Sequence, residues 1–318
     1  MSRRLLGVGA VAAAVLVSGC SGAAPTGFGD SSGGEHSARF VQQPWADLVV
    51  ETEIAMQVLT ELGYSASTQE VAVPLGAEAL ATGNADAYLG NWWPSQQDVF
   101  TEHIETGAVE VVGTVLEGTQ YSPAVPGYVV EELGVRSLAD LDRHADAFGR
   151  KIYGIEPGAP GNETINEAIA QDAYGLGDWE LVASSTEAML AEVSRRAAAG
   201  EPIAFLGWSP HWMATEYDLH FLDDPQSVWP GAGEVRSLTR AGLAEGDPNL
   251  VRFISQISVD TETASEFIRA VDKDGKPAEQ VARDWIQAHP DRIEAWLEGV
   301  TSVSGEPAAE VVLAGTGG

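Results

Sequence analysis

The chain has 318 residues, of which 17 are Lys or Arg and 47 are Asp or Glu, so its formal net charge at pH 7 is −30. A charge of this sign argues against nucleic acid as a partner, because it repels the phosphate backbone. The single cysteine, Cys20, excludes an intrachain disulfide. High acidity concentrates a cationic solute near the protein, but it also serves solubility in salty surroundings, and composition leaves both explanations open.

The N-terminal residues predict export. Arg3 and Arg4 precede an apolar run, residues 5–17, that is too short and too rich in Ala and Gly for a permanent membrane helix, so we expect residues 1–19 to be a signal peptide. Residues 17–20 read Val-Ser-Gly-Cys, which resembles the lipobox of bacterial lipoproteins. That resemblance implies a lipidated Cys20 that anchors the protein to the outer face of the cytoplasmic membrane. The alternative is an ordinary secretory signal followed by a chance cysteine.

Residues 20–37 contain few large apolar side chains and predict a flexible linker. The body that follows alternates strand-like and helix-like segments, which predicts an α/β fold with mainly parallel sheets. The expected strands span residues 39–42, 68–73, 85–89, 109–116, 124–130, 151–155, 180–183, 203–206 and 219–222. The expected helices are one that ends at Gly63, one that opens near residue 162 and runs to 174, and those at 76–82, 138–146, 187–199, 261–271, 278–288 and 290–298.

We expect this body to form two lobes. Residues 38–120 and 221–300 would make a discontinuous first lobe, residues 121–220 a second lobe, and residues 301–318 a disordered tail. Two lobes joined by two crossings of the chain hinge about the cleft between them, and a ligand held by both walls favours the closed form. This organisation is typical of a solute receptor.

Four aromatic residues follow strand-like runs inside stretches rich in Pro, Gly, Asn or Gln: Trp45, Trp92, Tyr121 and Trp208. Open α/β sheets bind ligands at strand ends, so these rings predict a cage in the cleft. Ring faces are negative, and Asp47, two residues after Trp45, adds a carboxylate. Such a cage suits a cation that hydrogen-bonds poorly, and the sequence therefore predicts an aromatic box for a quaternary ammonium compound.

Three polar candidates each have a second explanation. Asp47 also stands where a helix N-cap is expected, and capping would explain it without a ligand. Asn162 begins an expected helix whose amides could hold a betaine carboxylate, but its loop could equally be a plain Pro/Gly turn. His211 could donate to a ligand hydroxyl or carboxylate, or be a capping or buried structural histidine. The other tryptophans are expected to pack in the core or at the surface: Trp93, Trp179, Trp212, Trp229, Trp285 and Trp296.

Four stretches resemble signatures of one family: Gly-Asn-Trp-Trp-Pro at 90–94, Tyr-Ser-Pro-Ala-Val-Pro at 121–126, Ile-Tyr-Gly-Ile-Glu-Pro-Gly at 152–158 and Phe-Leu-Gly-Trp-Ser-Pro-His at 205–211. With them, residues 39–298 resemble the substrate-binding proteins of ABC importers for choline and glycine betaine, which have the two-lobed periplasmic-binding-protein type II fold. The resemblance implies delivery of a quaternary amine to an ABC permease with a cytoplasmic ATPase. It also implies that the four rings form the box and that Asp47 lies beside the cation, as in the choline-binding branch. We expect a monomer.

The loop at 156–162 departs from the family pattern. Choline-binding relatives offer an asparagine there for the polar end of the ligand, whereas this chain has Ala159 and Pro160, with Asn162 further on. The box tryptophan that glycine betaine members often carry in this loop is absent as well. The sequence therefore leaves open whether the ligand is choline, glycine betaine, carnitine or proline betaine.

No sequence motif predicts catalysis. Residues 207–211 superficially resemble a nucleophile elbow around Ser209, but Pro210 follows the serine and the last glycine is missing. The sequence has no His-Glu-x-x-His run, P-loop or cysteine pair, so we expect no enzyme, no metal and no cofactor. Two alternatives to a receptor stay open: a secreted choline-ester hydrolase that would use Ser209, and a surface adhesive or sensory module.

Overall fold

The computed structural model describes residues 36–315 of the chain. The predicted signal peptide, Cys20 and nearly all of the predicted linker lie outside the described residues. The strands are β1 (Ser37–Gln42), β2 (Ser65–Glu70), β3 (Ala87–Trp93), β4 (Val109–Val125), β5 (Lys151–Tyr153), β6 (Glu180–Val182), β7 (Ala204–Ser209), β8 (His220–Phe221) and β9 (Gly233–Arg240).

The helices are α1 (Ala46–Glu61), α2 (Val73–Ala81), α3 (Gln97–Glu105), α4 (Gly127–Leu133), α5 (Leu138–Leu141), α6 (Ala145–Phe148), α7 (Pro160–Ala170), α8 (Thr186–Ala199), α9 (Trp212–Glu216), α10 (Leu243–Gly246), α11 (Pro248–Gln256), α12 (Thr261–Asp272), α13 (Ala278–Ala288), α14 (Pro290–Trp296) and α15 (Ala308–Gly315). Two short 3-10 helices, η1 (Asp142–His144) and η2 (Ala173–Gly175), complete the described elements.

The strands follow one path, β2-β1-β3-β9-β4-β7-β5-β6, with β8 paired to β4. The long strand β4 joins the two halves of this path, because its residues 109–119 pair with β9 and its residues 120–124 pair with β7. Pairing is parallel among β1, β2 and β3 and among β5, β6 and β7, but every pairing of β4 and β9 is antiparallel. The expectation of mainly parallel sheets is therefore wrong at the junction. β4 carries the chain out and β9 brings it back, so the two must run in opposite directions.

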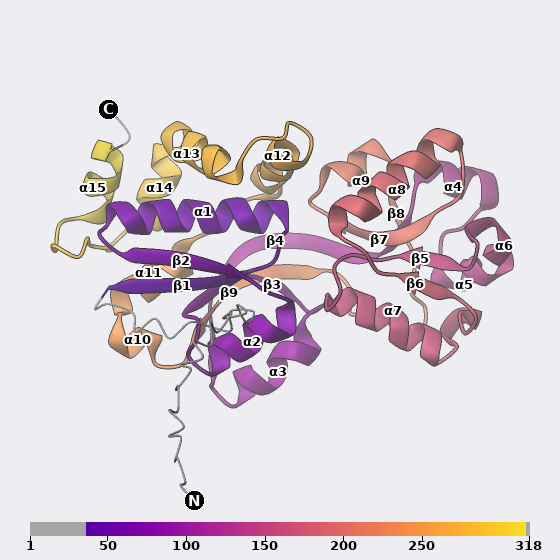
Figure 1. The fold of residues 1–318 in the computed structure, drawn as a ribbon, viewed down its shortest axis with the longest axis horizontal. Helices are drawn as coiled ribbons and strands as arrows, with labels where there is room; N and C mark the ends of the chain where they lie inside the picture. Colours follow the sequence, from indigo (N-terminus) through magenta and orange to yellow (C-terminus); the bar gives the residue numbers. More distant parts are fainter. Residues whose placement is uncertain (1–35, 316–318) are drawn as a thin grey trace, which may run out of the picture. The chain divides into compact units, whose positions relative to one another are not determined.

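Two hydrophobic cores lie on either side of this junction. Phe40 and Ile54 belong to the first, and Phe205 and Met213 belong to the second. We call lobe 1 the part around the first core, residues 36–119 and 233–315, and lobe 2 the part around the second, residues 120–232. Helices cover the lobe 1 sheet on both faces, with α1 and α13 on one and α2 and α3 on the other (Figure 1). Trp229 still packs in the second core, so the chain returns to lobe 1 later than residue 221.

Helix α1 sets the position of the predicted box. Its buried residues recur at helical spacing, Leu48, Ala55 and Leu59 among them, so one face packs against the lobe 1 sheet. The chain leaves the helix through Gly63, whose φ of +92° is a conformation that favours glycine. At the other end, the first turn of α1 faces the junction with lobe 2 and carries Trp45 and Asp47 there.

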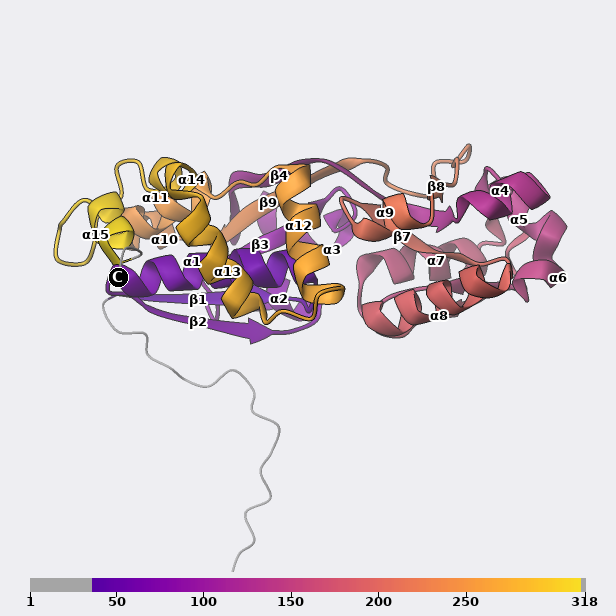
Figure 2. The same ribbon diagram turned by 90° about the horizontal axis from the view of Figure 1, so that it is seen from above.

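The expectation of a disordered tail from residue 301 is wrong for residues 301–315. Thr301 forms a β-bridge with Pro307, and α15 then packs against α1 and α14. Ala308 and Val312, four residues apart, are buried in the lobe 1 core. The Gly and Ser content of this segment masked a short amphipathic helix. In Figure 2, α15 lies at the end of lobe 1.

Candidate functional site

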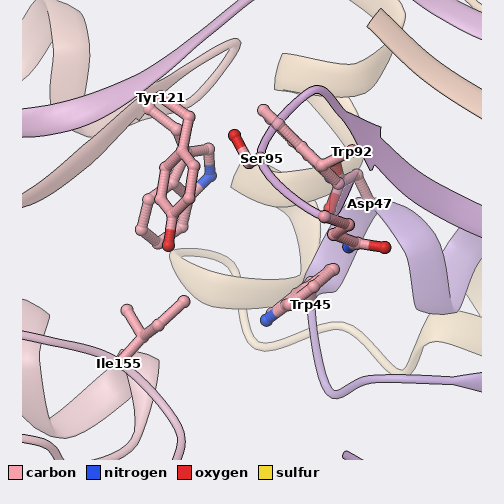
Figure 3. Close-up of a pocket in the computed structure, with 8 residues that line it drawn as sticks. Trp45, Asp47, Trp92, Ser95, Tyr121 and Ile155 are labelled. Carbon is pink, nitrogen blue, oxygen red and sulfur yellow. The ribbon is translucent and has the colours of Figure 1, made fainter. Parts of the chain in front are cut away.

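A cavity between the lobes encloses about 410 Å³ of space, its open mouth included. Its lining residues come from both lobes: Trp45, Asp47, Trp92, Ser95, Gln96, Tyr121, Ile155 and Trp208. Figure 3 shows Trp45, Asp47 and Trp92 on one side of the space and Tyr121 on the other. The structure thus brings together the four predicted rings and the predicted carboxylate, whereas Asn162 and His211 are not among the lining residues.

Each ring is fixed by the backbone that carries it. Trp45 is the residue before the first turn of α1, and Trp92 is the next-to-last residue of strand β3. Tyr121 on β4 and Trp208 on β7 are direct partners in the antiparallel register, so these two rings are held side by side. The sequence suggested that these residues follow their strands, but all three lie within them. Trp208, like Trp92, is the next-to-last residue of its strand, and Tyr121 lies four residues before the end of β4.

The rings meet edge to face. The Tyr121 ring centroid lies 6.0 Å from that of Trp92 and 6.3 Å from that of Trp208, with interplanar angles of 62° and 72°. Trp229 supports Tyr121 from behind, since its ring lies 5.4 Å away and its Nε1 donates to the Tyr121 carbonyl oxygen. Perpendicular rings around one space leave several faces free for a cation.

Asp47 is a buried carboxylate, with 6% of its surface exposed. It lies in the first turn of α1 and Trp45 takes the N-cap position, so Asp47 is not the N-cap, although first-turn backbone amides still favour its charged form. Burial raises the pKa of Asp47 to about 6, against the opposing effect of the backbone amides of Leu48 and Asp47, and the charge of Asp272 raises it further. A carboxylate that is costly to ionise alone gains most from a cation beside it.

Glu51 lies one helical turn after Asp47 and is 3% exposed. Burial and the neighbouring Asp47 charge raise the pKa of Glu51 well above its ordinary value. Two carboxyl groups this close do not ionise together readily, so the charge of Asp47 disfavours ionisation of Glu51.

Buried hydrogen bonds fix the turn that carries Trp92. Gln96 donates through Nε2 to the Gly90 carbonyl oxygen at 3.0 Å and accepts at Oε1 from Asn91 Nδ2 at 3.1 Å. The Tyr88 hydroxyl lies 3.2 Å from Gln96 Nε2, which donates to it. Because the Gln96 amide already makes these hydrogen bonds, the neighbouring Ser95 hydroxyl is the group on this turn that is left to bind a ligand.

Sequence reasoning missed three lining residues, Ser95, Gln96 and Ile155. Figure 3 shows the Ser95 hydroxyl directed into the space between the rings and Ile155 at its border. The signal for Ser95 and Gln96 was their place directly after the Trp-Trp-Pro turn, where polar residues continue a stretch that already held a predicted ring. Ile155 stands in the Ile-Glu-Pro-Gly stretch but carries no chemistry that marks it.

Asn162 lies behind the cavity wall and holds a turn. Its Oδ1 accepts from the Ile155 amide at 3.1 Å, and its Nδ2 donates to the carbonyl oxygens of Ile155 and Glu156, both at 3.0 Å. The side chain is 2% exposed and its polar groups are occupied. Of the two explanations for Asn162, the structure favours the turn, and its effect on the site is to fix Ile155.

His211 is a buried capping residue, 4% exposed. Its Nδ1 accepts from the Met213 amide at the start of α9, at 3.1 Å. Its Nε2 lies 3.6 Å from Asp272 Oδ2, and its ring packs edge to face on Trp208 with centroids 4.9 Å apart. Burial lowers the pKa of His211, and Asp272 partly offsets this effect. His211 thus contacts a box residue without lining the cavity.

The lobes also meet at the edge of the box through Glu156. On lobe 2 this carboxylate accepts from the Thr186 amide at 2.7 Å and from its hydroxyl at 3.1 Å. From lobe 1, Trp45 Nε1 donates to it at 3.4 Å, which is a long hydrogen bond. Trp45 is therefore oriented by both lobes.

Within residues 36–315, no group of His, Cys, Asp and Glu side chains is arranged to hold a metal ion. In the same part of the chain, no helix combines the length and the apolar character that crossing a membrane requires.

Comparison with known proteins identifies relatives over most of the chain. A family model described as the substrate binding domain of ABC-type glycine betaine transport system (OpuAC) matches residues 38–288. The glycine betaine/carnitine transport binding protein GbuC of Listeria monocytogenes is 35% identical over 173 residues, which are 54% of this chain and 57% of GbuC.

Two solved structures share the fold. One, titled an ABC-transporter choline binding protein in complex with choline, is 32% identical, with a TM-score of 0.85 over 88% of this chain and 98% of that one. The other, lactococcal OpuAC in a closed-liganded conformation with glycine betaine, is 25% identical, with a TM-score of 0.73 over 82% and 99%. The two-lobed type II periplasmic-binding-protein fold expected from the sequence is confirmed.

Proposed function

Since the chain belongs to the family of substrate-binding domains of ABC-type glycine betaine transport systems, it is a solute-binding protein of an ABC importer, and we propose that its solute is choline. The protein would capture choline outside the cytoplasmic membrane and deliver it to the permease. The box for the trimethylated nitrogen would consist of Trp45, Trp92, Tyr121 and Trp208, with Asp47 as the counter-charge.

The composition of the cavity wall carries this proposal. Among the described residues that line the cavity are four aromatic rings and one carboxylate, and no Arg, Lys or His. A desolvated cation gains about 2 kcal/mol on a ring, and Asp47 adds a direct charge interaction. Glycine betaine would bring its own carboxylate into this wall, where it would be desolvated without a cationic partner. A ligand with net positive charge fits better.

The polar end of choline needs one hydrogen-bond partner. The Ser95 hydroxyl is directed into the cavity (Figure 3), and the Tyr121 hydroxyl lies against Gly161. Neither hydroxyl has a hydrogen bond among the described residues. They would replace the asparagine that the loop at Ala159 lacks. The similarity to a choline-binding protein solved with choline supports the same ligand.

Calorimetry with three ligands tests the proposal: choline, glycine betaine and 3,3-dimethylbutan-1-ol, the neutral analogue in which carbon replaces the nitrogen of choline. We expect micromolar choline binding, since about −8 kcal/mol corresponds to that affinity. Glycine betaine should bind at least about tenfold more weakly, and the neutral analogue should give no measurable heat. Tighter binding of glycine betaine would overturn choline as the solute, and no heat with either choline or glycine betaine would overturn the quaternary ammonium site.

We also propose, from the sequence, that lipidated Cys20 tethers a monomeric receptor to the outer face of the membrane, with residues 21–35 as part of the linker. The hydrolase alternative gains no support, because Ser209 is not among the residues that line the cavity.

A further inference from the structure

A cluster of side chains joins the two lobes beside the box without lining the cavity. Lobe 1 contributes Asp272 and Lys273 at the C-terminal end of α12, and lobe 2 contributes His211, Trp212 and Glu216 at α9. The two helices are in contact and lie side by side in both ribbon views (Figures 1 and 2). We call these five residues the α9–α12 clamp.

Asp272 is the centre of the clamp. Trp212 Nε1 donates to its Oδ2 at 3.2 Å, and His211 Nε2 lies 3.6 Å from the same oxygen. The Asp272 side chain is 21% exposed, although the residue as a whole is exposed. Trp212 and His211 are both buried, so these contacts are partly shielded from water and are worth more than a surface pair.

Lys273 adds a second pair of contacts to the same helix. Its Nζ lies 3.6 Å from the centroid of the Trp212 ring, a cation–π arrangement, and 2.9 Å from Glu216 Oε2. One indole is therefore held by a carboxylate at its edge and an ammonium over its face. Both groups belong to lobe 1, whereas the indole belongs to lobe 2.

The clamp reaches the box through His211. The His211 ring packs 4.9 Å from Trp208 on one side and 4.9 Å from Trp212 on the other. Trp208 lines the cavity, and Asp272 contacts the other two rings of this stack, His211 and Trp212. The Asp272 charge also raises the pKa of Asp47, so the two carboxylates sense one another. Asp272 is thus coupled to both walls of the site.

The two ends of the clamp belong to different rigid bodies. Ala264 and Phe267 bury α12 in the lobe 1 core, and Met213 buries α9 in the lobe 2 core, which Ile268 of α12 also contacts. The lobes are connected by β4 and by the return before β9. A hinge rotation that moved α9 a few ångströms from α12 would break all of the clamp contacts together, because hydrogen bonds and cation–π contacts need short distances.

We propose that Asp272 is a positioning residue for cation binding, which holds Trp212 and His211 across the lobe boundary and thereby stabilises the closed form with Trp208 in place. The inference rests on the proposed function of the box. A ligand that needs the closed form binds more weakly when that form is less populated, so losing the clamp lowers affinity without removing a ligand contact.

The test is a double-mutant cycle with choline as the probe. Asp272→Ala removes the acceptor, and Trp212→Phe removes the donor while keeping a ring. We expect Asp272→Ala to weaken choline binding about tenfold, mainly through faster dissociation, and Trp212→Phe about threefold. The double variant should be little weaker than Asp272→Ala, because both changes remove the same contact. Asp274→Asn, an exposed acid two residues away, is the control and should bind as the unchanged protein does.

Small-angle X-ray scattering of the unliganded variants gives a readout that needs no ligand. Asp272→Ala should increase the radius of gyration relative to the unchanged protein and Asp274→Asn, because the closed form is less populated. An Asp272→Ala variant that melts at a lower temperature but keeps its radius and its choline dissociation rate would overturn the clamp. If the unchanged protein binds no quaternary ammonium compound, the proposed function fails, and the scattering result still decides whether the clamp holds the lobes.

Discussion

The two walls of the cavity contribute different chemistry. Lobe 1 supplies the carboxylate Asp47 and the polar residues Ser95 and Gln96, on a backbone fixed by buried hydrogen bonds. Lobe 2 supplies Tyr121 and Trp208 with an aliphatic neighbour, and among its described lining residues none carries a charge at neutral pH. Under the proposed function, selection by charge would belong to lobe 1, whereas lobe 2 would close over the ligand and exclude water. Changes to the first wall should alter which ligand binds, and changes to the second should alter how long it stays.

The largest effect is expected from Asp47→Asn. This change leaves a desolvated cation without its counter-charge, which costs several kcal/mol in buried charge pairs, so choline should bind about 100-fold more weakly. The neutral analogue, which should give no measurable heat with the unchanged protein, should stay undetected or become detectable, so the preference for the cation narrows. Calorimetry with both ligands measures this. Asp98→Asn, an exposed acid on α3, is the control. A loss of choline affinity below about threefold would place the charge selection elsewhere.

Truncation of one ring on each wall should cost less and should separate the walls kinetically. Trp92→Ala and Trp208→Ala each remove about 2 kcal/mol of cation–π attraction, or about 30-fold in affinity. Choline meets lobe 1 before closure, so we expect Trp92→Ala to slow association as well as speed dissociation, and Trp208→Ala to change dissociation alone.

Stopped-flow competition measures both rates, and Trp93→Ala is the matched control. Trp93 is the neighbour of Trp92, but its ring packs under the Arg236 guanidinium at 3.9 Å and does not line the cavity. Equal rate changes for the two box variants would contradict the division of roles between the walls.

The smallest effect is expected from pH. The pKa of Asp47 is raised to about 6, so the carboxylate that attracts the cation is lost as the pH falls through that value. Choline affinity should drop about tenfold between pH 7 and pH 5.

The free energy of unfolding should show the opposite pH dependence. A raised pKa means that the folded chain holds the proton more tightly than the unfolded chain, so this contribution is present at low pH and is lost as the pH rises through about 6.

Glu51 adds to the same trend in stability, because its pKa is raised as well. Thermal melts and calorimetry across this pH range measure the two opposing slopes. Asp47→Asn should flatten the affinity profile. A choline affinity that is constant from pH 5 to pH 7 in the unchanged protein would show that Asp47 is already ionised throughout.

The sequence predicts the box better than its surroundings. Large rings in polar stretches at strand ends have few structural explanations, so the sequence could predict that Trp92 and Trp208 line a cavity. Asn162 and His211 were ambiguous because an amide that closes a turn and a ring that caps a helix use the same groups that would bind a ligand. Asp47 looked like a cap because helix starts are uncertain by a residue or two, and here the helix begins at Ala46, two residues earlier than a cap at Asp47 would place it.

The fold was predictable where contacts are local and not where they are distant. Helices such as α13, residues 278–288, follow from apolar spacing and match the predicted bounds. Strand β9 was not predicted, because its pairing with β3 joins Trp92 to Val235 and no local pattern encodes so distant a partner. Its charged residues also weaken the alternation, since Arg236 is engaged with Asn91 and Arg240 with Asp86.

The direct pairing of Tyr121 with Trp208 in the β4–β7 register has a consequence for entry and release. When the lobes separate, Tyr121 and Trp208 would move together with lobe 2, whereas Trp45 and Trp92 would stay with lobe 1. The cage would then divide into two halves, each already assembled. A cation would bind first to a pair of rings that is already in place, and the slow step of capture would be the closure of one pair onto the other.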